Sequence, residues 1–288
     1  MGPLTAILTL PLLAQSAPSP QPFPQRLLAE EPEVRRLLEA LRPAEAHARM
    51  ETLLSEPRVA FDAKDANTTH QSSLRALYYS RALILAVQTA EFSGRWEQAV
   101  TYAKEGAAIA QENHDQCQKV LAPMAEGFQK MANEARAFLD KNAATLKELE
   151  SKQSVSESEW NLIEQAQGFR AKLAEGEKWG KFFQDDLDRA KADLERWPAG
   201  LADSLAKKIT DQDAEIAGYK VVKGDKVKWA EAVVGSRAYM ANYATPRDKV
   251  AFLHRLLVLA PGNAKIQKVL EGAWAGDGST NPPQKPSK

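Results

Sequence analysis

The chain has 288 residues, of which 44% are hydrophobic and 26% are charged, and its 38 basic side chains balance its 38 acidic ones. This length suffices for one large domain or two ordinary ones. The zero formal net charge argues against a general binder of nucleic acid or anionic membranes, because counterion release requires a dense basic face. Cys117 is the only cysteine, which excludes an intramolecular disulfide and a zinc site built from clustered cysteines.

The N-terminal segment has the pattern of an export signal. Residues 4–13 form a short apolar run, and the small residues Ala14, Ser16 and Ala17 follow. The run is too short to cross a bilayer and is typical of a secretory signal peptide, although no Lys or Arg precedes Arg26. We therefore expect a signal peptide over residues 1–17 and a protein exported to the periplasm or the cell exterior. The proline-rich residues 18–25 are expected to form a disordered leader.

Helical periodicity defines a first region, residues 26–117. Its opening stripe of leucines and valine predicts a helix with Pro32 in the first turn, where proline is tolerated. Pro43 opens a second helix that runs to Leu54. The polar stretch Ser55–Ser73 is expected to be mostly loop.

The stretch Leu74–Ala110 organises this region, because its apolar residues recur at three and four positions on both sides of a turn at Ser93-Gly94-Arg95. Gly94 stands where a helix C-terminus favours a residue that adopts positive φ. The pattern predicts two amphipathic helices that form a hairpin. Such a hairpin requires neighbouring helices to cover its remaining apolar surface.

The second region, residues 118–217, predicts long antiparallel helices packed along their lengths. From Leu121 to Leu149 the apolar residues, including Met124, recur at steps near the heptad period. Ser156 and Glu159 have the spacing of a capping box and predict the start of a new helix. Opposite charges four residues apart support helix over loop, at Glu126/Lys130, Glu177/Lys181, Asp185/Arg189 and Asp203/Lys207.

Residues 218–225 break the helical pattern and predict a linker. Four lysines lie in or next to this stretch, and Asp225 interrupts them. We interpret this run of charges as a solvated linker. Residues 226–275 then predict a C-terminal helical hairpin and a capping helix, with helices at Lys226–Tyr243, Pro246–Leu259 and Ala264–Trp274. The tail, residues 276–288, is expected to be disordered. Sustained alternation typical of strands is absent from the sequence, so we expect an all-α protein.

Two places in the chain carry the pattern of a helical repeat. The first combines a turn glycine, an aromatic residue, a small residue and upstream packing residues, at Gly94, Trp96, Ala99, Leu83 and Ala86. The second, His254–Leu270, has apolar residues followed by Pro, Gly, Asn and a new helix. Both resemble the tetratricopeptide repeat, although Val87 and Lys249 replace the small residues that this family prefers.

The resemblance implies stacked antiparallel helix hairpins, a TPR-like α-solenoid, with the long coiled-coil-like helices in the middle of the chain. It also implies a binding surface for another protein. The candidate partner-binding residues lie near the hairpin most similar to a repeat: Tyr79, Arg81, Trp96 and Tyr102. Aromatic residues and arginine are enriched at the centres of protein interfaces, whereas the alternative for a helical aromatic stripe is the core.

Catalytic motifs are weak throughout the sequence. The histidines lack the spacing of helix-borne zinc ligands, and His114 with Cys117 would need two further ligands. Ser204 and Lys207 match SxxK, but its companion motifs are absent from the sequence, as are phosphate-binding glycine loops. We therefore expect no catalytic residues, no cofactor and no metal.

The predicted function is a non-catalytic protein–protein interaction scaffold of the bacterial cell envelope. Its partner would be another protein of unknown identity. Nucleic-acid binding and stable membrane insertion are not expected, and a homo-oligomer is possible. One alternative is a structural coiled-coil spacer or self-associating element. A second alternative is a small-ligand carrier or an enzyme whose site is assembled from dispersed residues.

Overall fold

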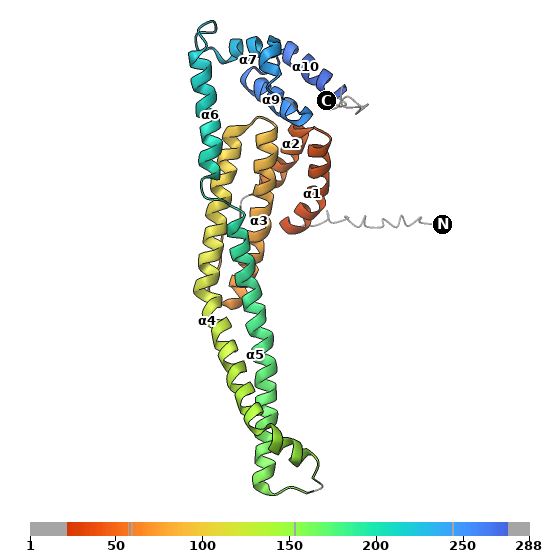
Figure 1. The fold of residues 1–288 in the computed structure, drawn as a ribbon, viewed down its shortest axis with the longest axis vertical. Coiled ribbons are helices and arrows are strands. Elements are labelled where there is room, and N and C mark those ends of the chain that lie inside the picture. The colour runs from red at the N-terminus through yellow and green to blue at the C-terminus, as the bar shows by residue number, and fades with distance from the viewer. Residues whose placement is uncertain (1–21, 57, 59, 153, 244, 276–288) are drawn as a thin grey trace, which may run out of the picture.

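The computed structural model describes residues 22–56, 58, 60–152, 154–243 and 245–275. Within these ranges every regular element is a helix, which confirms the expected all-α class with long helices. Figure 1 shows an elongated molecule built along α4 and α5, with the N-terminal helices on one side and the C-terminal helices at one end. The expected signal peptide and tail lie outside the described residues.

Helix α1 (Phe23–Glu39) and helix α2 (Pro43–Leu54) pack against each other and against α3. The α2 bounds match the prediction, whereas α1 begins three residues earlier than expected and includes part of the predicted 18–25 leader. The expectation for Pro32 was also wrong, because it lies inside α1. Proline has no backbone N–H, so the carbonyl of Leu28, four residues earlier, lacks its usual donor. Both Pro32 and Leu28 are exposed, so a water molecule can donate to this carbonyl instead.

Helix α3 (Ala66–Phe92) and helix α4 (Trp96–Glu150) form the predicted hairpin, with Gly94 at φ 73° in the turn. The predicted loop over Ser55–Ser73 was wrong in its last eight positions, since α3 already begins at Ala66. A capping box starts the helix there: the Asp65 carboxylate accepts from the Thr68 amide at 2.8 Å, and the Asp65 amide donates to Thr68 Oγ1 at 3.0 Å.

Helix α4 has 55 residues and runs without interruption across the predicted boundary between residues 117 and 118. The two regions therefore share this helix, and no domain boundary separates them at that point. Pro123 lies inside α4 on its exposed side, where the loss of one backbone hydrogen bond is compensated by water. Helix α5 (Glu157–Glu195) begins at the predicted capping box of Ser156 and Glu159 and returns antiparallel to α4.

The seam between α4 and α5 combines small residues with large apolar ones such as Leu121, Phe128 and Phe183. A Cβ atom on Gly176 would lie 2.7 Å from the Phe128 carbonyl oxygen and 3.0 Å from the Ala132 Cβ, so glycine is required for this close approach. The prediction that Met124 lies in the seam was wrong, because its side chain is 36% exposed whereas Ala125 and Ala132 are buried. Small residues therefore allow the two helices to approach closely at Gly176.

Helix α6 (Leu201–Gly218) continues beyond α5 and packs on α4. The C-terminal helices are α7 (Lys226–Gly235), α8 (Arg237–Met240), α9 (Pro246–Leu259) and α10 (Ala264–Ala275). The predicted bounds of α9 are confirmed, whereas the single helix expected over Lys226–Tyr243 was wrong because the chain breaks at Ser236, whose ψ is 112°. The linker lies where predicted, except that Gly218 ends α6.

The expected ion pairs are replaced by others that use one member of each pair. The observed pairs are Lys130 with Glu134, Glu177 with Arg136, Arg189 with Asp186, and Lys207 with Asp211. Three or four residues in either direction bring side chains together on a helix, and a second helix offers further partners. The spacing therefore predicted the helices correctly and the partners incorrectly.

Candidate functional site

The four residues predicted to bind a partner are engaged within the chain itself. Tyr79 is only 9% exposed, and its ring lies 5.3 Å from the Phe23 ring. Burial raises the pKa of the Tyr79 hydroxyl, and Glu105 adds to this effect through its charge and a hydrogen bond. Tyr102 is half-buried, with its ring 6.2 Å from that of His47. Both tyrosines therefore support the junction of α1–α4.

Arg81 and Trp96 also have intramolecular partners. Arg81 forms an ion pair of 2.6 Å with the buried carboxylate of Glu31, which also pairs with Arg35. Trp96 is half-buried, and the guanidinium of Arg255 lies 4.5 Å from its ring centroid. The structure does not gather Tyr79, Arg81, Trp96 and Tyr102 into one open surface, so their partner-binding role stays a prediction.

Arg255 joins the C-terminal helices to the α3–α4 turn, a contact that the sequence did not reveal. Its side chain is 1% exposed and donates to the Gly94 carbonyl at 2.9 Å, to Glu97 at 3.0 Å and to Gln212 at 2.8 Å. Burial would raise the pKa of Glu97, but the hydrogen bond and charge of Arg255 outweigh it and lower the pKa. A Cβ on Gly94 would lie 2.4 Å from the Arg255 backbone, so the contact depends on glycine.

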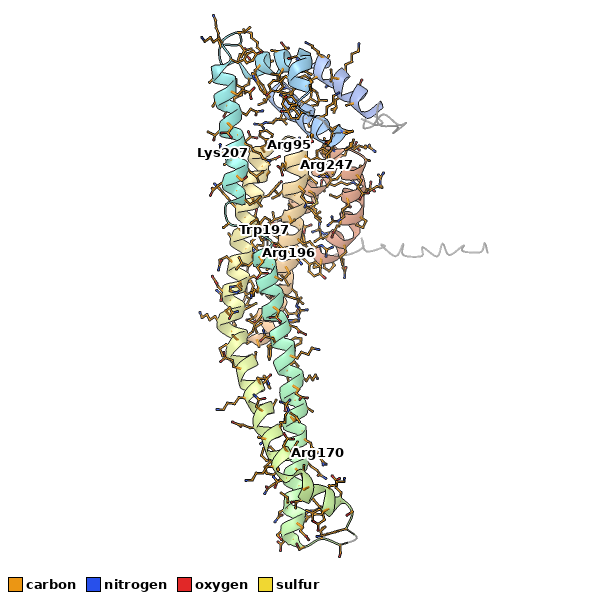
Figure 2. The ribbon with its side chains drawn as sticks, in the orientation of Figure 1. Arg95, Arg170, Arg196, Trp197, Lys207 and Arg247 are labelled. Atoms are coloured by element: carbon orange, nitrogen blue, oxygen red, sulfur yellow. The ribbon has the colours of Figure 1, made fainter. Side chains whose placement is uncertain are left out.

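A second buried junction lies around Trp197, between the end of α5 and the start of α6 (Figure 2). The Trp197 indole donates to Ser80 Oγ at 2.8 Å, and the Ser80 hydroxyl donates to Asp193 at 3.0 Å. Burial raises the pKa of the Asp193 carboxyl, although the Ser80 hydrogen bond opposes it. The Trp197 ring occupies the space beside Gly106, where a Cβ would approach it to 2.1 Å. These hydrogen bonds join α3 to the C-terminal end of α5, and the packing of Trp197 beside Gly106 adds α4 to the junction.

A third polar cluster lies at the start of α3. His70 Nδ1 is 2.6 Å from Asp186 Oδ2, and Arg189 pairs with the other oxygen of this carboxylate. Cys117 is fully buried nearby, and burial raises the pKa of its thiol. The Cys117 thiol donates to Asn113 Oδ1 at 3.6 Å within α4, whereas the pair of His70 and Asp186 joins α3 to α5.

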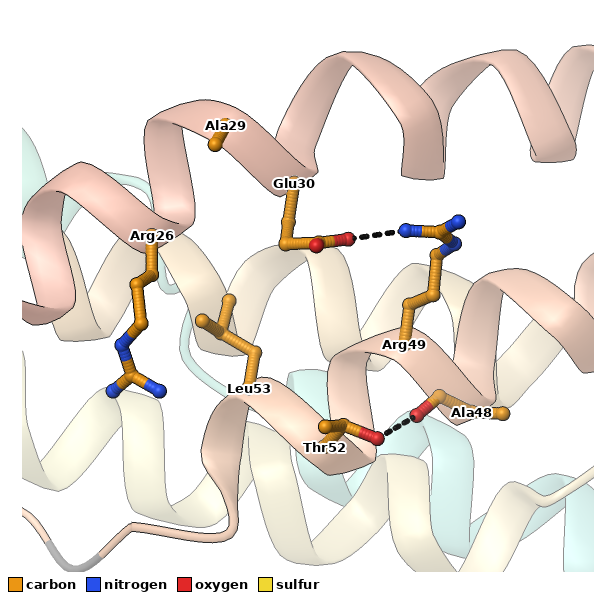
Figure 3. A pocket seen from close by; sticks show the side chains of 7 residues that line it. All are labelled: Arg26, Ala29, Glu30, Ala48, Arg49, Thr52 and Leu53. Atoms are coloured by element: carbon orange, nitrogen blue, oxygen red, sulfur yellow. Dashed lines mark hydrogen bonds and ion pairs between the residues drawn. The ribbon is translucent and has the colours of Figure 1, made fainter. Parts of the chain in front are cut away.

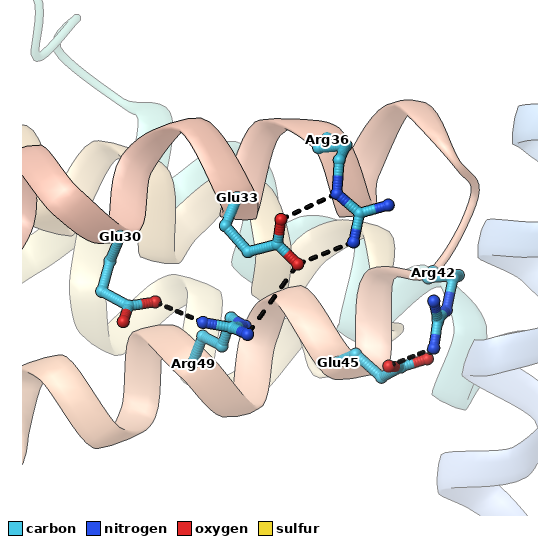
Figure 4. Close-up of polar contacts among 6 residues, drawn as sticks. All are labelled: Glu30, Glu33, Arg36, Arg42, Glu45 and Arg49. Carbon is cyan, nitrogen blue, oxygen red and sulfur yellow. Dashed lines mark hydrogen bonds and ion pairs between the residues drawn. The ribbon is translucent and has the colours of Figure 1, made fainter. Parts of the chain in front are cut away.

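One groove lies between α1 and α2 and has a volume of about 550 Å³. Figure 3 shows the ion pair of Glu30 and Arg49, 2.7 Å long, across its middle. Figure 4 shows that the pair belongs to a network in which Glu33 contacts both Arg36 and Arg49, beside a separate pair of Arg42 and Glu45. The charges of this groove satisfy one another, which leaves little free charge for a ligand.

A larger groove of about 910 Å³ runs between α4 and α5 on the elongated part of the molecule. Its lining extends from Gln118 to Arg136 on α4 and from Glu177 to Lys191 on α5, and it is open to solvent. At 1.5 Å per residue the α4 side is about 27 Å long, or about five helical turns. Acidic and basic side chains are interspersed along it. We call it the α4–α5 groove.

Within the described ranges, no cluster of three or more histidine, cysteine or acidic side chains could hold a metal ion. The helices of this part of the chain also lack the combination of length and apolar composition needed to cross a bilayer. Comparison with known proteins gives no matching family model, no matching curated protein and no matching solved structure. The tetratricopeptide resemblance therefore stays an expectation.

Proposed function

We propose that this chain is a non-catalytic interaction protein of the bacterial cell envelope that holds a helix of another protein in the α4–α5 groove. The observation that carries the proposal is the groove itself, about 910 Å³ in volume and lined mainly by polar and charged side chains of α4 and α5. A length of about five turns suits a helical segment of a partner. The envelope location rests on the signal-like pattern of residues 1–17.

The chemistry of the groove favours a protein helix over a small molecule. Small-molecule sites are usually enclosed and mostly apolar, with a few convergent polar groups. The α4–α5 groove is open, and five acidic and four basic side chains line it: Glu126, Glu134, Glu177, Asp185, Asp188, Lys130, Arg136, Lys181 and Lys191. Mixed charges of this kind select a partner by complementary charge and fix its register.

Site-specific photo-crosslinking tests the proposal. A photoreactive residue at Gln184, inside the groove, should give an adduct with one envelope protein in cells that produce the full chain. The same residue at the exposed Lys104, outside the groove, is the matched control and should not give this adduct. K181E/K191E reverses two groove charges that have no ion pair among the described residues, and it should abolish the adduct. Identical adducts from Gln184 and Lys104 would refute the proposal.

The second candidate function is a spacer or self-associating element. It is favoured by the far end of the α4–α5 hairpin, which projects beyond α3 in Figure 1. Trp160, near the tip, is 58% exposed, which is unusual for a large aromatic side chain. An adduct between two copies of the chain at Gln184 would support self-association in place of a separate partner.

A further inference from the structure

The turn between α6 and α7, residues 219–225, and the first three residues of α7 expose an unusual set of side chains at one end of the molecule, opposite the α4–α5 tip in Figure 1. Val221 is 85% exposed, Tyr219 is 37% exposed and Val227 is 44% exposed. Exposed apolar residues that gather in one short segment mark interaction sites more often than scattered ones do. We call this segment the α6–α7 turn.

The α6–α7 turn has a defined conformation. The Val222 amide donates to the Tyr219 carbonyl at 3.0 Å, and the Asp225 amide donates to the Val222 carbonyl at 3.0 Å. Val222 is buried in the core of the C-terminal helices, and Asp225 caps α7 by accepting from the Val227 and Lys228 amides. Val222 and Asp225 therefore hold the turn in place against the C-terminal helices, whereas Val221 points into solvent.

The charges around this apex are mainly basic. Lys220, Lys223, Lys226 and Lys228 surround Val221 in the sequence, and all four are exposed. The acidic groups that face them are Asp213, paired with Lys226 at 2.6 Å, and Asp225, which lies 3.5 Å from Lys228. Lys220 and Lys223 have no ion pair within the described part of the chain. The turn thus presents apolar side chains together with two uncompensated positive charges.

We propose that the α6–α7 turn docks the protein on the surface of an anionic lipid bilayer, with Val221 and Tyr219 entering the headgroup region and Lys220 and Lys223 contacting lipid phosphates. Apolar side chains flanked by lysine are the usual means of interfacial binding to anionic membranes. A protruding apex fits a planar surface, whereas peptides are received by grooves or sheet edges. The exposed lysines agree with the solvated run expected from the sequence, and the proposal adds a membrane contact at this turn.

Vesicle flotation of the full chain tests the proposal. The protein should float with phosphatidylcholine vesicles that contain phosphatidylglycerol and should stay in solution with pure phosphatidylcholine. K220Q/K223Q should lower the partition coefficient about 25-fold, because each lysine near an anionic surface contributes about fivefold. V221D should lower it at least about tenfold, since an apolar side chain no longer enters the interface. Raising the salt concentration should release the wild-type protein.

Matched controls separate this turn from general charge effects. K104Q/K141Q removes two exposed lysines elsewhere, and V258D places the same carboxylate at another exposed valine. Both variants should float like the wild type. Equal flotation of K220Q/K223Q and the wild type, or binding to neutral vesicles, would overturn the proposal. Binding to polyglutamate without binding to anionic vesicles would also overturn it, in favour of an acidic protein partner.

Discussion

At the scale of single residues, Arg255 has the largest predicted effect on stability. R255A leaves the Gly94 carbonyl oxygen and Gln212 Oε1 without their donor, in a site where Arg255 is 1% exposed. We expect a loss of about 3 kcal/mol in the free energy of unfolding, measured by urea denaturation. R247A is the control, because Arg247 is exposed and its guanidinium lies 5.0 Å from the centroid of the Phe92 ring, a contact that predicts a loss below about 1 kcal/mol. Equal losses would contradict this role.

His254 predicts a pH dependence of stability. Burial, reinforced by the charge of Arg95, lowers the pKa of His254 from 6.5 to about 4. At a pH between 4 and 6.5, His254 is protonated in the unfolded chain and neutral in the native state. The free energy of unfolding is therefore highest above pH 6.5 and decreases as the pH falls toward 4. The loss amounts to about 3 kcal/mol.

Urea denaturation at a series of pH values measures this effect. H254Q should flatten the dependence between pH 6.5 and 4, whereas H114Q, at a more exposed histidine, should keep the wild-type dependence. A dependence that is the same in H254Q and the wild type would assign it to other groups. His47 is the first of these, because burial lowers the pKa of this fully buried histidine as well.

At the scale of helices, two glycines of α4 predict opposite effects. G106A places a methyl group 2.1 Å from the Trp197 ring, so the α5–α6 junction must shift, and we expect a loss of about 1–3 kcal/mol. G127A meets no atom within 4 Å on the same helix, and we expect a gain of about 0.5–1 kcal/mol because alanine favours helix. Thermal unfolding of both variants measures the difference. Similar effects would exclude a close Trp197 contact.

Local capping chemistry made several helix ends predictable from the sequence. Pro43 and Pro246 begin their helices, Ser156 and Glu159 form a capping box, and Gly94 takes the positive φ of the turn. The early start of α3 was missed because Thr68, rather than the usual Glu or Gln, completes its capping box. The length of α4 was missed because a pattern break and Pro123 do not end a helix whose exposed side is solvated.

The buried polar contacts could not be predicted from the sequence. Arg255 and Glu97 are 158 positions apart, and Trp197 and Ser80 are 117 apart, so no local pattern connects them. The candidate residues Tyr79 and Trp96 were found by their aromatic chemistry, but that chemistry serves packing and interfaces equally well. The choice between the two depends on which helices pack together, and only the fold supplies this information.

At the scale of the whole molecule, helix lengths alone predict an elongated shape. The 55 residues of α4 span about 80 Å. A compact domain of 288 residues would have a radius of gyration of about 19 Å, so X-ray scattering of the full chain should give a clearly larger value. A value near 19 Å would mean that the α4–α5 hairpin folds back.

Sedimentation then distinguishes the two candidate functions. An elongated monomer at all concentrations is expected for a protein that keeps the α4–α5 groove open for a different partner. A concentration-dependent dimer would favour self-association, and W160A would then test whether the tip mediates it, because Trp160 is 58% exposed and its removal has little cost for folding. A dimer that K181E/K191E disrupts while W160A leaves it intact would instead place a second copy in the groove.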